Sequence, residues 1–423
     1  MNDAHDHVPS LASPRRIHVI GGGTVFHVRP HLALSAVAYG GTARRIGELC
    51  RETKREATLH LTRMARGGEG ELETPADVAR LLEQLVADPD TGIVFMPVAL
   101  CDYEGHVLEG DVATESGKNQ PRLRTRDGVA SLRLQPADKL IARVRATRKD
   151  IFLVGFKTTA GATEDEQYEA ALRLLKRSHC NLVLANDVHT RRHMIVVPEL
   201  ARHAVTFDRE HALRELVAMA LLRSRLSFTR TTLAEGPLVP WNDARVPAAL
   251  RTVVEHCVAR GAYKPFDDVT VGHFAVRAGE HTLFSSRRRR NFNRAADRDL
   301  VRVDFDGEQM TALGARPSAG TRSQFAVLRA HPEYDCIVHF HCPRRSASRV
   351  PVRSQREFEC GSHECGRNTS DGMERFGPLA AVMLDRHGPN VIFRSDGDPR
   401  AVIDFIEANF DLTRATGESD SIR

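Results

Sequence analysis

Two histidines separated by one residue, His339 and His341, stand in the stretch IVHFHCP at residues 337–343. The apolar residues before them are typical of a β-strand, in which alternate side chains point to the same face. The two imidazoles would then lie side by side, as ligands of one metal ion do. The same spacing also fits two ordinary polar residues on the solvated face of a sheet. The stretch alone leaves both interpretations open.

Polar and glycine residues also follow the predicted strands of the first half of the chain. Apolar runs end near residues 20, 100, 156 and 185, and helical patterns at 74–87 and 164–179 stand between them. Strands that alternate with helices predict a mostly parallel sheet of Rossmann-like α/β type, with ligands at the carboxyl ends of the strands. The residues expected to meet there are Gly22, Gly23, Thr24, Asp102, Phe156, Lys157, Asn186 and Asp187.

A second glycine patch, YGGTARRIGEL at residues 39–49, opens a predicted helix. Gly41 and Thr42 begin its first turn, and Arg44 and Arg45 follow at once. Free backbone amides and guanidinium groups at a helix start favour an anion. The pattern therefore predicts a phosphate-binding turn.

The segments GGGT, VRPHLALSAVAYGGTARRIGEL, VALCDY, QPADKLIARV, FLVGFKTTAG and NLVLANDV occur in one order over residues 15–225. In order and spacing they resemble the phosphopantothenate–cysteine ligase family. The resemblance implies a nucleotide-dependent carboxylate–amine ligase, which forms an acyl-nucleotidylate from CTP or ATP with Mg²⁺ before an amine attacks it. Asn186 matches the asparagine that contacts the acyl-nucleotidylate. Lys118 is the nearest match to a triphosphate-binding lysine.

The chain departs from that pattern at two motifs. AYGGTARRIG stands where the family has SSGKMG, and Lys157 stands where small residues are usual. These departures indicate retained nucleotide binding with a changed acid, and they leave a change of the amine open. The alternative is a degenerate copy of the domain that serves dimerisation.

The second half restarts after a proline-rich linker at residues 226–247. The predicted order is a helix, a hairpin at 271–286, a strand from 300, a helix at 321–334, the strand of His339, a strand at 379–393 and a final helix. This order resembles the class II aldolase/adducin family. The resemblance implies an α/β domain with a central, mainly antiparallel sheet.

That family holds a metal with an H-x-H pair and a later histidine before a glycine. Here these ligands fall on His339, His341 and His387, and the resemblance implies Zn²⁺ or another divalent cation. It also implies lyase, epimerase or dehydratase chemistry on a small polar, phosphorylated metabolite. The position of the family's proton-transfer acid is Gly320, and its glycine–asparagine pair appears as Gly272-His273.

Two segments could supply the acid and the substrate contacts that these departures remove. FECGSHECGRNTSDG, residues 358–372, lies between the metal strands, and we expect Glu364 or Glu359 to act as the acid/base. The alternative is a surface turn. The run RRRRNFNR at 287–294 is either a solvated loop or an anion site for phosphates.

Composition narrows the classes of protein. The chain has 423 residues, a net charge of +5, 41% hydrophobic residues and 6% aromatic residues. No apolar run approaches the roughly 20 residues of a membrane-spanning helix, and the polar N-terminus does not read as a secretory signal. Nucleic-acid binding would need a broader basic and aromatic surface. We therefore predict a cytoplasmic protein that binds neither membrane nor nucleic acid.

The predicted organisation is a disordered tail (1–14), a ligase-like nucleotide-binding domain (15–225), the linker, a metal domain (248–412) and a C-terminal tail (413–423). The first prediction is a bifunctional enzyme whose partners are small-molecule substrates and a nucleoside triphosphate. In the second, only one domain is catalytic and the other binds ligand or builds the oligomer; in the third, neither is catalytic. Both resemblances imply a homo-oligomer, a dimer or a tetramer.

Overall fold

The structure is a computed structural model that describes residues 15–307 and 309–416. The predicted N-terminal tail, residues 1–14, and residues 417–423 of the predicted C-terminal tail lie outside this part of the chain.

The chain forms two compact units. The first runs to Val196 and includes Ala204–Ser224, and the second contains Val197–His203 and the residues from Arg225 onward. The predicted linker is thus part of the second unit, and the functional domain boundaries stay a prediction.

The first unit is built on a sheet of seven strands within the described residues, in the order β12-β11-β10-β9-β5-β1-β4. The pairs from β4 through β1, β5 and β9 to β10 are parallel, and β11 joins β10 antiparallel. The predicted parallel sheet is confirmed. The bounds are β1 (Arg16–Gly21), β4 (Ala57–Leu61), β5 (Thr91–Phe95), β9 (Phe152–Thr159), β10 (Leu182–Asp187), β11 (His193–Val196) and β12 (Arg202–Thr206).

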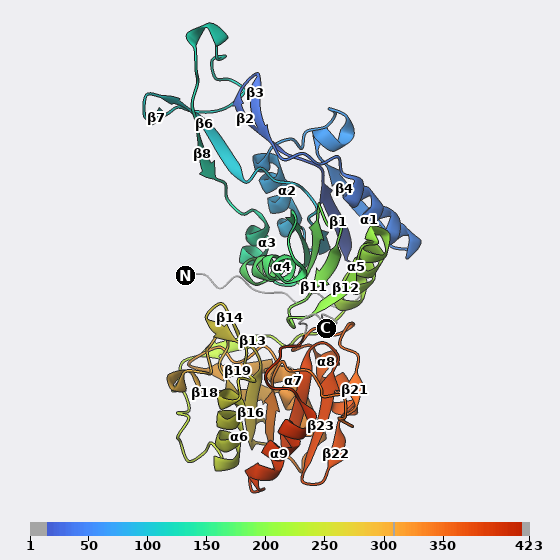
Figure 1. Ribbon diagram of the computed structural model, residues 1–423, viewed down its shortest axis with the longest axis vertical. Helices are drawn as coiled ribbons and strands as arrows, with labels where there is room; N and C mark the ends of the chain where they lie inside the picture. Colours follow the sequence, from blue (N-terminus) through green and yellow to red (C-terminus); the bar gives the residue numbers. More distant parts are fainter. Residues whose placement is uncertain (1–14, 308, 417–423) are drawn as a thin grey trace. The chain divides into compact units, whose positions relative to one another are not determined.

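Helices cover both faces of this sheet (Figure 1). One face carries α1 (Gly41–Glu52) against α5 (Arg209–Arg223), and the other carries α2 (Pro75–Ala87), α3 (Ile141–Thr147) and α4 (Glu164–Ser178). The start of α2 shows why the sequence clearly predicted where this helix begins. The Thr74 hydroxyl accepts from the Asp77 amide, and the Asp77 carboxylate accepts from the Thr74 amide, which closes a capping box before Pro75.

Two small sheets complete the first unit. β2 (Val25–Arg29) pairs with β3 (Leu32–Ser35), and β6 (Tyr103–Glu109) pairs with β7 (Val112–Ala113) and β8 (Leu132–Pro136). These strands were not predicted from the sequence. Every residue of β8 is exposed, so its side chains carry no burial pattern that a sequence could display.

The second unit is built on one sheet of ten strands within the described residues. Nine follow the order β13-β19-β18-β17-β16-β20-β24-β23-β21, and β22 pairs with β23. The β13–β19 and β21–β23 pairs are parallel and the other pairs are antiparallel, which confirms the mainly antiparallel sheet. The bounds are β13 (Thr231–Ala234), β16 (His273–Gly279), β17 (Thr282–Ser286), β18 (Leu300–Asp306), β19 (Gln309–Leu313), β20 (Cys336–His339), β21 (Val352–Arg353), β22 (Glu374–Phe376), β23 (Leu379–Leu384) and β24 (Gly388–Phe393). A separate pair is β14 (Pro265–Phe266) with β15 (Val269–Thr270).

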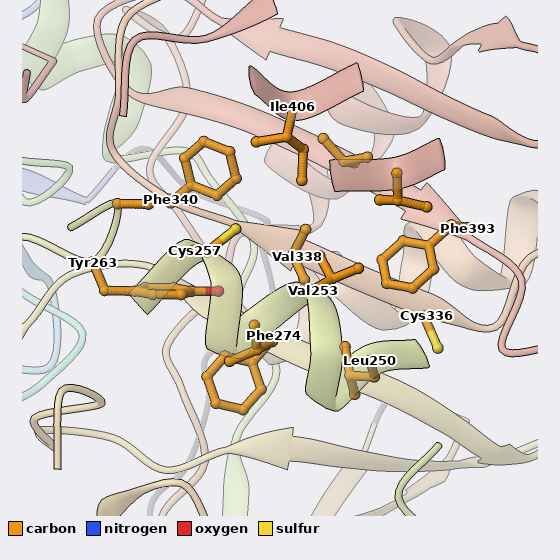
Figure 2. Close-up of a cluster of buried hydrophobic side chains, with 14 of the residues drawn as sticks. Leu250, Val253, Cys257, Tyr263, Phe274, Cys336, Val338, Phe340, Phe393 and Ile406 are labelled. Carbon is orange, nitrogen blue, oxygen red and sulfur yellow. The ribbon is translucent and has the colours of Figure 1, made fainter. Parts of the chain in front are cut away.

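Alternation along β20 decides which way its histidine points. Cys336 and Val338 enter a core with residues of α6 (Ala248–Ala259) and α9 (Pro399–Asn409), shown in Figure 2. Ile337 enters the other core with Phe325 of α7 (Thr321–Ala330), which contacts α8 (His363–Asp371). His339 therefore lies on the α7 face of the sheet.

Two predicted elements were wrong in extent. The single strand expected at 379–393 is the antiparallel pair β23 and β24, joined by a tight turn in which Arg386 has a positive φ of 55°. All residues of both strands are buried, so no alternation marked the break. The helix expected at 321–334 ends at Ala330, since Pro332 has no amide to continue it.

Within the described residues, no helix combines the length and the apolar content that crossing a bilayer requires.

Candidate metal centre

The three predicted histidines meet in the second unit. His339 ends β20, His341 follows it by two residues, and His387 closes the turn between β23 and β24. One nitrogen from each lies within 4.8 Å of the others, all three residues are buried, and Nε2 of His339 is 3.2 Å from Nε2 of His387. No other group of three or more potential ligands of this kind is present among the residues that the structure describes. The arrangement can hold one divalent cation.

The chemistry of these side chains fits a metal. Nδ1 of His339 lies 2.8 Å from the carbonyl oxygen of Pro389, so it carries the ring proton and leaves Nε2 free of one. Burial lowers the pKa of His339 to about 4, although the Pro389 carbonyl opposes the shift. The ring is therefore neutral near pH 7, as a metal-binding imidazole must be.

A fourth imidazole, His273, lies beside the cluster. β16 and β20 pair with His273 directly opposite His339, and the ring centroids are 4.5 Å apart. Burial, followed by the neighbouring His339, holds the pKa of His273 well below its usual range. The family resemblance placed His273 at the asparagine of the glycine–asparagine pair that helps bind substrate phosphate, but it did not predict a position beside the metal ligands. The contact arises from strand pairing between distant segments, which one sequence does not display.

Gly320, at the position expected for an acid, faces this fourth imidazole. A Cβ atom built on Gly320 would lie 2.2 Å from Nε2 of His273. The space that a longer side chain would need at residue 320 is occupied by the ring of His273.

The segment predicted to replace the acid does lie beside Gly320. A Cβ atom on Gly361 would be 2.2 Å from the carbonyl oxygen of Ala319. Glu364, in the first turn of α8, accepts a hydrogen bond of 3.0 Å from the Ser227 amide. That contact gives Glu364 a structural task, and acid/base roles for Glu364 and Glu359 stay a prediction.

The arginine run divides between two environments. The side chain of Arg287 donates to the carbonyl oxygens of Ala296 and Asp299, and Arg294 forms a salt bridge with Asp268. Arg288 instead has cationic neighbours: desolvation, then the charges of Arg289 and Arg316, lower the pKa of its guanidinium, although the residue is exposed.

In the first unit, the strand ends predicted to share a crevice are neighbours. β1, β5, β9 and β10 are adjacent and parallel, so their carboxyl ends lie along one edge. The Thr24 hydroxyl accepts from the Cys101 amide at 3.0 Å, and the Thr158 hydroxyl donates to Oδ1 of Asn186 at 3.3 Å. The structure therefore brings Thr24 to the loop after β5, and Asn186 to the end of β9.

Two of the predicted glycines have packing reasons of their own. Gly22 has a φ of 104°, and a Cβ atom there would lie 2.1 Å from Oγ1 of Thr62. A Cβ atom on Gly23 would lie 2.1 Å from the carbonyl oxygen of Ala36. Close chain packing thus explains both glycines without a phosphate, and phosphate binding there stays a prediction.

Asp187 is committed to the backbone. Its buried carboxylate accepts from the amides of Gly161, Ala162, His189 and Thr190 and from the Thr159 hydroxyl. These hydrogen bonds, led by that from the Thr190 amide, hold the pKa of Asp187 well below its usual range. Its neighbour Asn186, and Phe156 and Lys157 on β9, are half-buried.

Several predicted anion-binding residues already have protein partners. Lys118 forms a salt bridge with Glu73, and Asp102 forms one with Lys139. Arg44 donates to the carbonyl oxygens of Tyr39 and Ala65. Thr42, next to Gly41, accepts from Arg209 at 2.8 Å, and Arg45 binds Glu210. Nucleotide contacts by these residues stay a prediction.

Comparison with known proteins supports both resemblances. Residues 256–395 match the family model described as Class II Aldolase and Adducin N-terminal domain. The N-terminal half is similar to the coenzyme A biosynthesis bifunctional protein CoaBC of Thermococcus kodakarensis, at 27% identity over 184 residues. That match covers 43% of this chain and 43% of the relative, so the chain spans less than half of the relative's length.

Two solved structures are similar at low identity. A DNA/pantothenate metabolism flavoprotein from Streptococcus pneumoniae aligns at 21% identity with a TM-score of 0.42, over 49% of this chain and 98% of its own. An L-fuculose 1-phosphate aldolase aligns at 15% identity with a TM-score of 0.29, over 38% of this chain and 80% of its own.

Proposed function

We propose that the second unit is a metal-dependent lyase, epimerase or dehydratase that acts on a small polar carbonyl compound. The observation that carries this proposal is the convergence of His339, His341 and His387 as buried potential ligands. Three imidazoles leave a coordination position open, and a divalent cation such as Zn²⁺ bound there supplies Lewis-acid polarisation of a substrate carbonyl. The match of residues 256–395 to the class II aldolase model supports the same chemistry.

The residues of the chain would prepare this site for its substrate. The carbonyl of Pro389 holds His339 in the tautomer that presents Nε2, and the two cores on either side of β20 fix the strand in place. Glu364 or Glu359 remains our proposal for the proton-transfer group, and in Glu364 the oxygen Oε2 already accepts from the Ser227 amide.

An anionic group on the substrate is the second part of the proposal. The Arg288 amide donates to the carbonyl oxygen of Arg316, so these two residues are neighbours, and the charges of Arg289 and Arg316 act on the Arg288 guanidinium. A phosphate would relieve that repulsion through charge-assisted hydrogen bonds. We expect Arg288→Ala to raise the KM for a phosphorylated substrate by about tenfold with little change in kcat.

The test is turnover of phosphorylated hydroxycarbonyl compounds, followed by NMR, with chelator-treated and metal-restored protein. Metal-free protein should be inactive, and Zn²⁺ or another divalent cation should restore turnover. Full turnover by metal-free protein would contradict the proposal.

For the first unit we propose a CTP- or ATP-dependent carboxylate–amine ligase that requires Mg²⁺. The similarity to CoaBC and the placement of Asn186 at the sheet edge support it. Release of pyrophosphate should depend on an acid, and Asn186→Ala should abolish that release. Release that needs no acid, or that survives Asn186→Ala, would contradict the proposal.

A second candidate is that only the second unit is catalytic. The salt bridge of Lys118 with Glu73 and the backbone contacts of Arg44 favour it, since both cations expected at the nucleotide have other partners. A full panel of acids and amines that releases no pyrophosphate with either nucleotide would support this candidate.

The cytoplasmic location, the absence of nucleic-acid and membrane partners, and the homo-oligomer are also proposals. The mass of the purified chain in solution distinguishes monomer, dimer and tetramer.

A further inference from the structure

Residue 320 must be a glycine because of a neighbouring side chain and not because of its backbone conformation. Its φ of −78° and ψ of −1° are ordinary for any residue. The Cβ atom of any other residue would meet the ring of His273, at 2.2 Å from Nε2 and 2.6 Å from Cδ2. A side chain at 320 and the present position of His273 therefore exclude each other.

The ring of His273 is held from its other side by α7. The Ser285 hydroxyl donates to Oε1 of Gln324 at 3.3 Å, which turns the amide nitrogen of Gln324 toward Nδ1 of His273 at 2.5 Å. Thr321, Ser285 and Gln324 are all buried, and Thr321 and Ser285 lie 2.7 Å apart. An imidazole that accepts a hydrogen bond at Nδ1 carries its proton on Nε2.

Nε2 is the part of this ring that remains for a ligand. His273 is only 6% exposed, and Nε2 makes no hydrogen bond with any residue in the described part of the chain. Since Nε2 has no hydrogen-bond partner within the described residues and its ring packs with a centroid distance of 4.5 Å against that of His339, it is available to a ligand bound at the candidate metal centre. The ring of His273 contacts that of His339 in the candidate metal centre and the side chain of Gln324 in α7.

We propose that His273 contacts the substrate of the metal centre, donating a hydrogen bond from Nε2 to an oxygen bound beside the metal, and that Gly320 is kept small to admit it. This inference rests on the proposed metal function. The proposed acid/base role of Glu364 or Glu359 is separate from this contact.

The test uses the full chain loaded with Co²⁺, and azide as a probe anion, followed by visible absorption at one fixed pH. Binding of Co²⁺ is measured first. His273→Leu should bind Co²⁺ as the unchanged protein does, but its affinity for azide should fall by about tenfold, the loss of one hydrogen bond to a charged group. His273→Gln, which keeps a donor, should lose less.

Two further variants make the result specific. Gly320→Ala should weaken azide as His273→Leu does, since its Cβ atom displaces the ring. His281→Leu, at an exposed position between β16 and β17, should change nothing. Correct folding is checked by the fluorescence of Trp241, the only tryptophan, whose ring lies 5.3 Å from that of Phe274 next to His273.

Three outcomes would overturn the inference. Unchanged azide affinity in His273→Leu would make the ring structural, and loss of Co²⁺ from that variant would make it a metal ligand. Failure of the Co²⁺-loaded unchanged protein to bind azide would show that no open position faces His273. Failure of the unchanged protein to bind Co²⁺ at all would instead refute the proposed metal function, which is a separate result.

Discussion

Asn186 and Asp187 are adjacent at the end of β10 but have different tasks. Asp187 is buried and accepts five hydrogen bonds from the turns around it, whereas Asn186 is half-buried and contacts the Thr158 hydroxyl. The sequence indicated both as ligand contacts, because a motif does not separate a residue that shapes a loop from one that faces a ligand. Contact geometry makes that separation.

Substitutions at Asp187 and Asn186 should therefore have different effects: the first should lower stability, and the second should lower activity alone. Asp187→Ala leaves several buried amides unpaired and should lower the free energy of local unfolding by about 3 kcal/mol, measured by amide exchange across β9 and β10. Asn186→Ala should leave that exchange nearly unchanged. Equal protection in Asp187→Ala and the unchanged protein would show that the turn does not depend on the carboxylate.

At the metal centre, the residue types were predictable and their surroundings were not. His339, His341 and His387 were placed by spacing and by family resemblance, and they do converge. The partner of Gly320 was hidden, because the strand pairing of His273 with His339 joins distant segments. Likewise the salt bridges that engage Lys118 and Asp102 depend on side-chain positions that a sequence pattern does not contain.

At the scale of elements, prediction succeeded where burial is periodic or caps are marked. α2 begins at Pro75 after its Thr74 cap, and α4 and β9 follow their apolar patterns. It failed where every residue has the same environment. β8 is wholly exposed, and β23 with β24 is wholly buried, so neither shows an alternation that reveals its limits.

The parallel pair β1 and β4 carries a pH-sensitive contact. Nδ1 of His18 lies 3.1 Å from Nε2 of His60, and burial followed by the charge of His18 lowers the pKa of His60 from 6.5 to about 4. Between these two values the unfolded strands take up a proton that the folded strands do not. The stability that this contact contributes is therefore fully present above the unfolded-state pKa of 6.5. It is lost as the pH falls toward the folded-state pKa of about 4.

Amide exchange of peptides from β1 and β4 should show this dependence. Protection should decrease as the pH falls from about 6.5 to about 4, after correction for intrinsic exchange. His60→Leu removes one of the two imidazoles whose pKa is lowered and should make the decrease less steep. An equally steep decrease in His60→Leu would assign the effect to other groups.

At the scale of the whole molecule, the two units carry separate candidate chemistries. Each unit has its own sheet and its own site residues. We therefore expect Asn186→Ala to abolish acid-dependent pyrophosphate release without changing metal content or metal-dependent turnover. His387→Ala should do the reverse, with both reactions measured on the same preparations. Loss of both reactions in either variant would show that the sites depend on each other.

The most direct test of the proposed metal centre is the metal content of the purified full chain, determined by elemental mass spectrometry. We predict about one divalent cation per chain, bound through three imidazoles. His339→Ala should lose it, while His281→Ala, an exposed histidine outside the cluster, should retain it. A chain that neither contains nor takes up a divalent cation, or a His339→Ala variant that keeps a full complement, would contradict the metal centre.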